Sequence, residues 1–328
     1  MDDPKTDYSI IVPVYNEEDS ILPLYNKLKN LLIVLGSHEI VFVDDGSTDQ
    51  TFQRLSECAE KDKRVKIIKF RRNFGQSAAL KSGFDYANGE RVITIDADLQ
   101  NNPEDIPKLL EQFEKGYDVV CSWRKNRKDP FFRKKVPSKI FNWFCRRVSG
   151  QHLHDFGSTL RVYRQEVVRS IRMYGDLHRY ILVLIAWKGY KISEVKVKHQ
   201  PRKYGKTKYG GERLIRGFLD MLTVYFLEKH LSRPMHLFGT IGVLSSGLGA
   251  IIGIYLSILK ILYGVPLSDR PLLLLAILLI IFGVQFFSFG LITEMLTKYQ
   301  YETNLKKPYD IERYVNLNLL GESNKREH

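Results

Sequence analysis

Two carboxylates and one amide lie close together in residues 96–100, Asp-Ala-Asp-Leu-Gln. The preceding residues, 91–95, are mostly apolar and β-branched, which predicts a buried strand that ends at Asp96. In open α/β sheets, ligands bind at the carboxyl ends of the strands. Carboxylates at such a strand end suit a hard divalent cation, which can in turn hold a diphosphate. An Asp-rich turn without a ligand fits the same five residues, so the rest of the sequence has to distinguish the two.

Two earlier predicted strands, 8–14 and 39–43, also end in polar residues. Strands and helices alternate along this part of the chain, which predicts a parallel, doubly wound sheet with these strand ends at one edge. A nucleotide pocket would explain all three clusters. Acidic side chains can accept hydrogen bonds from the base and the ribose, and a metal ion can bind the phosphates. No G-x-G-x-x-G and no P-loop motif is present, so neither explains the binding. The polar residues after the two earlier strands are Tyr15, Glu17, Asp44 and Asp45.

A first basic segment, residues 124–147, contains ten Lys or Arg against one acid. Apolar residues within it, including Trp143 and Phe144, recur at helical spacing. A basic amphipathic helix with aromatic residues on its apolar side is typical of a membrane interface. We expect such a helix over about 131–149, and a solvated helix packed on the domain is the alternative. The expected polar face carries Lys135, Ser138, Lys139, Asn142 and Arg146.

A second basic segment, residues 196–216, contains eight Lys or Arg against one acid and includes Gly205. A cation-rich loop with a glycine can wrap phosphates. Between the two segments, Asp155 precedes Gly157, which fits either a simple turn or an acid beside a sugar. The nearby His152 and His154 are a weak metal signal without a third partner.

Two uncharged stretches, 237–259 and 272–293, each exceed the roughly 20 residues that a helix needs to cross a bilayer. They predict a two-helix transmembrane hairpin over 235–296, with an amphipathic juxtamembrane helix before it at 211–234 and a tail after it at 297–328. The basic residues flanking the hairpin predict a cytoplasmic location for the N-terminal domain (1–210) and for both termini, and the N-terminus lacks a signal-peptide pattern. The expected location is therefore the inner (cytoplasmic) membrane, as a multi-pass protein.

The net charge of +13 predicts an anionic partner or surface. A membrane explains this charge better than nucleic acid does, because the same chain carries the apolar stretches. The three cysteines have no metal-like spacing and are expected to be reduced thiols. Small residues in the first apolar stretch suit close helix packing and are consistent with a homo-oligomer.

Five ordered motifs resemble those of family 2 glycosyltransferases with a GT-A fold: PVYNEE, VDDGSTD, RRNFGQ, DADLQ and HQPRKYGKTKY. The branch that the chain most resembles is the polyprenyl-phosphate glycosyltransferases, which include dolichol-phosphate mannose synthases and GtrB-like bactoprenol glucosyltransferases. The Q-x-x-R-W motif of processive members is absent. The resemblance implies an α/β fold with a Rossmann-like, mostly parallel sheet, followed by amphipathic interface helices and two transmembrane helices.

The resemblance also implies roles for individual residues. Pro13, Tyr15 and Glu17 would hold the nucleoside. Further contacts to base or ribose would come from Asp44, Asp45, Gln76 and Asp96. The metal, Mg²⁺ or Mn²⁺, would be held by Asp98 and Gln100, with Asp96 beside it. Asp155 would be a base or a sugar contact and would share the catalytic role with Asp98. The donor or acceptor phosphates would be bound by Arg124, Lys135, Ser138, Arg202 and Lys206.

The implied reaction is an inverting, metal-dependent transfer of a hexose to polyprenyl (undecaprenyl) phosphate at the cytoplasmic face of the membrane. We expect UDP-glucose as the donor, with GDP-mannose, UDP-GlcNAc or an aminoarabinose nucleotide as alternatives. The non-enzymatic alternative is a membrane-tethered nucleotide-binding scaffold.

Overall fold

The computed structural model describes residues 6–125, 136–171, 173, 177–197, 223, 225–226, 234–264, 266, 270–302 and 309–317 of the 328-residue chain. The chain forms two compact units. The first unit comprises Met1–Asp220 together with Lys307–His328, and the second comprises Met221–Lys306.

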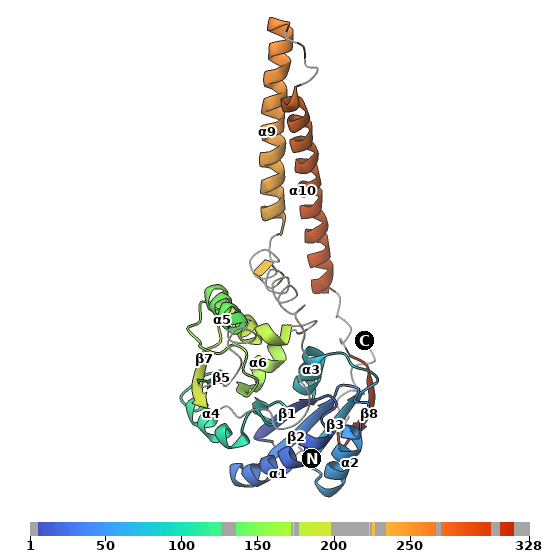
Figure 1. Cartoon of the computed structure of the whole chain (residues 1–328), viewed down its shortest axis with the longest axis vertical. Coiled ribbons are helices and arrows are strands. Elements are labelled where there is room, and N and C mark those ends of the chain that lie inside the picture. Colours follow the sequence, from blue (N-terminus) through green and yellow to red (C-terminus); the bar gives the residue numbers. More distant parts are fainter. Residues whose placement is uncertain are drawn as a thin grey trace. The chain divides into compact units, whose positions relative to one another are not determined.

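An eight-stranded sheet forms the centre of the first unit (Figure 1). Its strands are β1 (Tyr8–Val14), β2 (His38–Asp44), β3 (Val65–Phe70), β4 (Arg91–Thr94), β5 (Val119–Arg124), β6 (Arg161–Arg164), β7 (Ile192–Val197) and β8 (Ile311–Val315). Their order across the sheet is β7-β5-β6-β4-β1-β2-β3-β8. The pairs β1–β2, β1–β4, β2–β3 and β5–β7 are parallel. The prediction of a mostly parallel α/β sheet is therefore confirmed.

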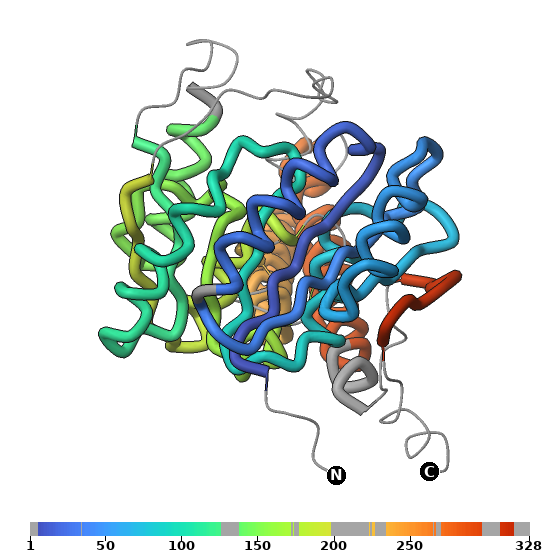
Figure 2. The backbone as a smooth tube through the Cα atoms, turned by 90° about the horizontal axis from the view of Figure 1, so that it is seen from below, coloured from blue at the N-terminus to red at the C-terminus, as the bar shows by residue number. Residues whose placement is uncertain are grey.

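Helices cover both faces of this sheet (Figure 1, Figure 2). The helical elements of the first unit are α1 (Glu18–Leu35), α2 (Thr51–Lys61), α3 (Gln76–Tyr86), η1 (Pro103–Asp105), α4 (Ile106–Phe113), α5 (Val136–Ser149), α6 (Gln165–Ser170), η3 (Leu177–Tyr180) and α7 (Ile181–Trp187). Along β2, Ile40 and Phe42 join the core beneath α1, α2 and α4, whereas Val41 and Val43 join the core beneath α3. This alternation follows from the two-residue period of a strand.

Two strands run against the parallel direction. β6 is antiparallel to both β4 and β5, and β8 is antiparallel to β3. The helix α5 lies in the connection between β5 and β6, so a helix between two strands did not by itself indicate that they are parallel. The alternating pattern therefore predicted the parallel strands, missed the direction of β6 and did not predict β8.

β8 comes from the tail that follows the second apolar stretch. Tyr309, just before this strand, is buried, and its ring stacks on Phe70 with centroids 5.2 Å apart. The Tyr309 hydroxyl donates to Asp85 Oδ2 at 2.8 Å. Just after the other end of the strand, the Asn316 amide donates to the carbonyls of Ala59 and Val65, both at 2.9 Å. The tail is thus part of the fold of the first unit.

The basic helix α5 has an outward and an inward side. The outward side carries Ile140, which is 56% exposed, and Trp143, which is 64% exposed. We expected Asn142 on the polar outer face, and this was wrong: it is 9% exposed, because its amide bonds to backbone groups of the domain. Phe144 and Val148 are half-buried. The exposed basic residues of the helix are Lys139, Arg146 and Arg147.

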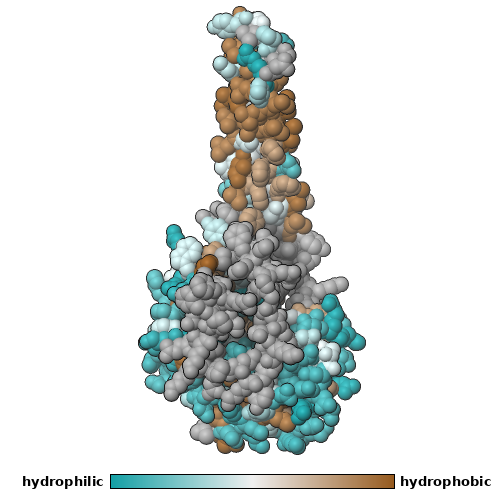
Figure 3. Space-filling view, in the orientation of Figure 1, coloured by the Kyte–Doolittle hydropathy of each residue, from teal (hydrophilic) through white to brown (hydrophobic). Residues whose placement is uncertain are grey.

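The second unit contains two long apolar helices, α9 (Pro234–Tyr263) and α10 (Pro271–Glu302). Pro234–Tyr263 and Pro271–Leu296 are long and apolar enough to cross a membrane, with mean hydropathies of 1.9 and 2.7. Their outward surface is dominated by hydrophobic side chains (Figure 3). The predicted pair of apolar C-terminal helices is confirmed as two candidate membrane spans.

Small residues let α9 and α10 pack closely against each other. A Cβ on Gly242 would lie 2.6 Å from the Gly283 carbonyl oxygen, and one on Gly249 would lie 2.7 Å from that of Ala276. Packing through small residues is typical of helices in lipid. Here these glycines serve contacts within one chain, so they give no support for a homo-oligomer.

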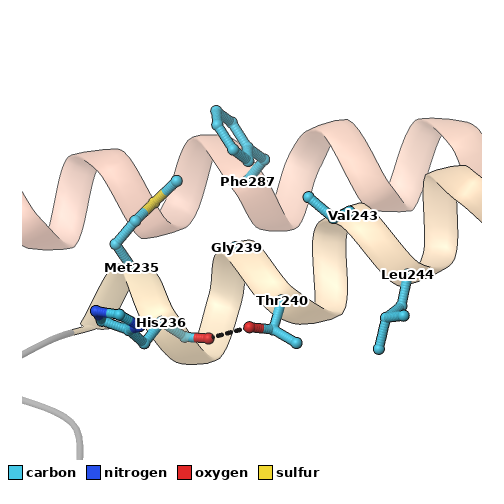
Figure 4. Close-up of a pocket in the computed structure, with 7 residues that line it drawn as sticks. All are labelled: Met235, His236, Gly239, Thr240, Val243, Leu244 and Phe287. Carbon is cyan, nitrogen blue, oxygen red and sulfur yellow. Dashed lines mark hydrogen bonds between the residues drawn. The ribbon is translucent and has the colours of Figure 1, made fainter.

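A shallow groove lies along the start of α9 (Figure 4). It is mostly apolar and contains no carboxylate, and the Thr240 hydroxyl donates to the His236 carbonyl at 2.5 Å beside it. The residues lining it are Met235, His236, Gly239, Thr240, Val243, Leu244 and Phe287. All seven residues belong to the second unit, whereas the acidic strand ends belong to the first.

Candidate active site

Asn16 joins the loop after β1 to the loop after β2. Its backbone N–H donates to Ser47 Oγ at 3.0 Å, and its side-chain Oδ1 accepts from the Thr48 N–H at 2.9 Å. Asn16 has a φ of 51°, a conformation that asparagine tolerates better than most residues. The Glu17 N–H donates to Thr51 Oγ1 at 2.9 Å. These bonds hold the predicted nucleoside-binding segment, with Pro13, Tyr15 and Glu17, against the end of β2.

Asp44 is a buried acid, and one of its two carboxylate oxygens accepts no hydrogen bond from the described residues. Its Oδ1 accepts from the Ser47 N–H at 2.9 Å, while its buried Oδ2 has no hydrogen-bond partner among the described residues. Burial raises the pKa of Asp44 above its ordinary value. A buried oxygen without a partner is costly. Asp44 Oδ2 is therefore suited to accept from a ribose hydroxyl or a base N–H.

Asp45 has a different role from that of its neighbour. Its two oxygens accept from the backbone N–H groups of Phe74 and Gly75, at 2.7 and 2.9 Å. Gly46 completes the contact, since a Cβ there would lie 2.8 Å from the Arg72 Cα. Of the two predicted acids, Asp45 thus holds the RRNFG loop in place, and Asp44 is the better candidate for a nucleoside contact.

Asp96 is fixed on both of its oxygens. Gln76 Nε2 donates to Oδ1 at 3.0 Å, and the Thr159 hydroxyl donates to Oδ2 at 2.8 Å. Thr159 Oγ1 also accepts from Asn101 Nδ2 at 2.9 Å. Burial and then the charge of Asp98 raise the pKa of Asp96 to about 6. The predicted residues Gln76 and Asp96 are therefore in contact, whereas Thr159 and Asn101 were missed.

Asp98 and Gln100 form a tight turn just beyond Asp96. The Gln100 N–H donates to Asp98 Oδ1 at 3.1 Å, and Leu99 between them has a φ of 58°. Among the described residues, no group of three or more His, Cys, Asp or Glu side chains could hold a metal. Mg²⁺ is usually held by one or two carboxylates while substrate phosphates and water supply the other ligands. The charge of Asp98 disfavours the ionised form of Asp96, and a divalent cation bound there would offset this repulsion.

Asp155 and Arg124 form a buried ion pair. Arg124 Nε donates to Asp155 Oδ2 at 2.7 Å, and Arg124 Nη2 donates to Oδ1 at 3.0 Å. The Gly157 N–H also donates to Oδ1 at 3.2 Å. Both oxygens of Asp155 are engaged, so the arrangement favours orientation of a ligand over removal of a proton. Arg124 was predicted to bind phosphate and Asp155 to contact the sugar. The two residues form one ion pair.

Arg161 is a second buried cation that sequence reasoning missed. Its Nη2 donates to the Phe156 carbonyl at 2.9 Å, and its Nη1 donates to the Tyr163 hydroxyl at 3.3 Å. The charges of Arg124 and Arg161 both favour the ionised form of Asp96, although burial outweighs them. The sequence signal that could have identified Arg161 is an arginine at the start of a short, largely buried strand.

The other predicted phosphate-binding residues are only partly described. Ser138 is half-buried on α5. Lys135, Arg202 and Lys206 lie outside the described residues, as does most of the predicted juxtamembrane helix 211–234.

Comparisons with known proteins agree with this geometry. The model of the family "Glycosyl transferase family 2" matches residues 9–172. Dodecaprenyl-phosphate galacturonate synthase of Rhizobium johnstonii is 35% identical over 306 residues, 92% of this chain and 90% of that protein. The chain belongs to glycosyl transferase family 2. This glycosyltransferase is also 34% identical to undecaprenyl-phosphate 4-deoxy-4-formamido-L-arabinose transferase of Proteus mirabilis, over 94% of this chain and 93% of that protein.

A solved structure shares the fold. Glucosyl-3-phosphoglycerate synthase of Mycobacterium tuberculosis, in complex with Mn²⁺ and UDP-glucose, has a TM-score of 0.54 at 17% identity. The match covers 67% of this glycosyltransferase and 79% of that chain. The predicted GT-A fold and the resemblance to polyprenyl-phosphate glycosyltransferases are therefore confirmed, and the non-enzymatic alternative loses its support.

Proposed function

We propose that this glycosyltransferase transfers a sugar from a nucleotide sugar to a polyprenyl phosphate at a membrane surface. The observation that carries the proposal is the acidic cluster at the end of β4, with Asp96 held by Gln76 and Thr159. The same chain contains two helices of membrane-spanning length. Relatives named for dodecaprenyl and undecaprenyl phosphate match over more than 90% of the chain, which supports this acceptor.

The donor side uses the ends of β1, β2 and β4. The nucleoside binds the segment Pro13 to Glu17 and the unpaired oxygen of Asp44, and Gln76 and Asp96 fix the ribose side. Asp98 and Gln100, with Asp96 beside them, are the residues that would hold a divalent cation. When bound, that cation neutralises charge on the departing nucleoside diphosphate as a Lewis acid.

The acceptor side needs no strong base. An oxygen of the polyprenyl phosphate attacks C1 of the sugar from the face opposite the diphosphate. The new bond joins C1 to the acceptor oxygen, and the old C1–O electron pair leaves with the diphosphate, so the configuration inverts. The second pKa of a phosphate is about 6, so the attacking group is already ionised near pH 7. The Asp155–Arg124 pair orients the sugar or the acceptor, and the cations at Lys135, Arg202 and Lys206 remain predicted phosphate contacts.

The identity of the sugar is the open part of the proposal. From sequence we expected UDP-glucose, whereas the relatives are named for galacturonate and for 4-deoxy-4-formamido-L-arabinose. Donors that carry these two sugars are therefore our first candidates, and the aminoarabinose nucleotide among the original alternatives belongs to this group. Glucose becomes the second choice.

The proposed topology places both ends of the α9–α10 hairpin on the same side of the inner membrane. β8 lies in the tail and pairs with β3, so the chain returns after α10 to the unit that it left before α9. This connectivity supports an even number of crossings. The basic residues that precede α9 favour the cytoplasmic side for that unit.

The test uses membranes that contain the full chain, undecaprenyl phosphate and a panel of radiolabelled nucleotide sugars. We expect labelled lipid with one donor, and a loss of at least about 100-fold in the Asp98→Ala variant. Glu111→Gln, which changes an exposed acid on α4, is the matched control and should keep full activity. Full activity of Asp98→Ala without added metal would refute the metal assignment, and no labelled lipid with any donor would refute the transfer.

A further inference from the structure

The amide of Asn142 bridges two backbone groups that flank Asp155. Its Nδ2 donates to the His154 carbonyl at 2.9 Å, and its Oδ1 accepts from the Phe156 N–H at 3.2 Å. The segment around Asp155 lies in neither helix nor strand, so its backbone groups need partners from elsewhere. One side chain of α5 thus supplies bonds on both sides of the acid.

These bonds continue into the candidate active site. His154 is anchored a second time, because its backbone N–H donates to Glu194 Oε2 at 2.7 Å. Between the two anchored residues, Asp155 forms its bidentate pair with Arg124 at the end of β5. A shift of Asn142 would move the two peptide groups on either side of Asp155, and with them the carboxylate that orients Arg124.

The helix that carries Asn142 is itself held firmly on its inner side. Trp187 Nε1 donates to the Val148 carbonyl at 3.2 Å, and the Phe141 ring lies 5.4 Å from that of Tyr180. The outer side presents Ile140 and Trp143 beside exposed basic residues. Apolar side chains flanked by cations suit the surface of an anionic bilayer. One short helix therefore contacts the Asp155 segment on one side and offers a lipid-compatible surface on the other.

We propose that Asn142 is a positioning residue that ties the Asp155–Arg124 pair to the membrane-facing helix α5. When α5 rests on lipid, Asn142 fixes the height of the pair above the surface, where the phosphate of a lipid acceptor lies. The proposal rests on the proposed function for its catalytic consequence, but the mechanical link between α5 and residues 154–157 does not depend on it.

The first experiment measures kinetics of Asn142→Ala and Asn142→Asp in anionic vesicles that contain polyprenyl phosphate. We expect kcat to fall about 10- to 100-fold in Asn142→Ala, since a misplacement of about 1 Å can cost that much. The KM for the nucleotide sugar should change less than kcat, because the described hydrogen bonds of the Asn142 side chain go to His154 and Phe156 and not to the nucleoside segment or the Asp96–Gln100 turn. Asn142→Asp keeps the acceptor for the Phe156 N–H and should lose less activity than Asn142→Ala.

A matched control separates positioning from simple loss of stability. Asn316→Ala removes two amide-to-carbonyl bonds in the same unit, at β8, and should lower thermal stability at least as much while kcat is kept. An Asn142→Ala kcat equal to that of the wild type, or a fall no larger than that of Asn316→Ala, would refute the positioning role.

The second experiment tests the connection between α5 and residues 154–157 without measuring enzyme activity. Hydrogen–deuterium exchange of residues 154–157 should slow when anionic vesicles are added to the wild-type chain, and should not respond in Asn142→Ala. An equal response in both proteins would overturn the link even if transfer to lipid is observed. If no sugar is transferred to any lipid but this difference is present, the proposed function fails while the link stands.

Discussion

The hydroxyl of Thr159 holds one oxygen of Asp96, the acid next to the proposed metal site. Thr159→Val keeps the shape of the side chain but removes both the bond to Asp96 and the acceptor for Asn101. Partners of this kind usually contribute 10- to 100-fold to metal affinity. We therefore expect Mn²⁺ affinity, measured calorimetrically in the presence of a nucleotide sugar, to fall about tenfold. Thr159→Ser keeps the hydroxyl and should bind Mn²⁺ like the wild type; equal weakening in both variants would contradict this role.

Asp45 makes stability depend on pH. Burial raises the pKa of its carboxyl from 3.8 to about 6. Between these values the folded chain binds a proton that the unfolded chain does not, so the free energy of unfolding falls as pH rises from about 4 to about 6. Above pH 6, ionisation of the buried Asp45 carboxyl lowers the free energy of unfolding by about 3 kcal/mol. The Asp45→Asn variant has no ionisable group at this position and should not show this loss.

Thermal denaturation of detergent-solubilised wild type and Asp45→Asn at pH 4 to 7 measures this difference. Asp45→Asn also loses an acceptor for a backbone N–H, which shifts its stability by a constant amount at every pH. The wild type should lose stability relative to the variant as pH rises through this window. Parallel pH profiles for the two proteins would show that Asp45 does not titrate there.

Neighbouring acids show what a sequence can and cannot predict at this scale. The positions of Asp44, Asp45, Asp96 and Asp98 at strand ends follow from alternating strands and helices. Which of the two adjacent acids, Asp44 or Asp45, binds the RRNFG loop depends on the path of that distant loop, and the sequence does not give that path. Asn142 is a similar case, since polarity predicted exposure but a buried amide can satisfy two backbone groups.

β8 seals the edge of the sheet beside the RRNFG loop. The Arg71 N–H donates to the Asp310 carbonyl at 3.2 Å, and Tyr309 stacks on Phe70. Tyr309→Ala removes a buried ring and should destabilise the first unit by about 3–5 kcal/mol. Tyr309→Phe keeps the stacked ring but loses the hydroxyl that donates to Asp85, and should cost about 1 kcal/mol.

Thermal denaturation of the full-length variants measures these costs. Loss of the Tyr309 ring should loosen the RRNFG loop, which leads directly to Gln76, the partner of Asp96. Nucleotide-sugar affinity should therefore fall further in Tyr309→Ala than in Tyr309→Phe. Equal stability of Tyr309→Ala and the wild type would mean that the tail strand does not hold this edge.

The order of elements was predictable for most of the first unit, but the direction of β6 and the presence of β8 were not. The parallel strands carry long apolar runs, and helices follow them at regular intervals. β6 has only four residues, and its direction depends on the path of the preceding loop. β8 has mixed polar and apolar residues, and it joins the sheet only because β3 offers a free edge.

At the scale of the molecule, the pairing of β3 with β8 constrains the proposed membrane topology. β3 and β8 are paired, so the segments before α9 and after α10 must lie on the same side. With that side in the cytoplasm, as proposed above, single engineered cysteines at Ile33 and Glu312 should resist a membrane-impermeant maleimide in intact spheroplasts, whereas one at Pro266, between the helices, should react. The native cysteines Cys58, Cys121 and Cys145 are buried and give little background.

Permeabilised spheroplasts are the control, since all three engineered cysteines should react once the membrane is open. Labelling of Glu312→Cys but not Ile33→Cys before permeabilisation would contradict an even number of crossings.

The pairing of β3 with β8 also has a consequence for how the protein is made. Phe70 and Ile311 are about 240 positions apart, so at 5–20 residues per second the ribosome needs on the order of 10–50 s to reach β8 after finishing β3. Both apolar helices emerge within this interval, while the edge of β3 still lacks its last neighbour. Unpaired sheet edges readily join other chains. A nascent chain that stalls or is cut before Tyr309 therefore keeps an unpaired edge on β3, and β8, the last of the described strands, protects the first unit from aggregation at that edge.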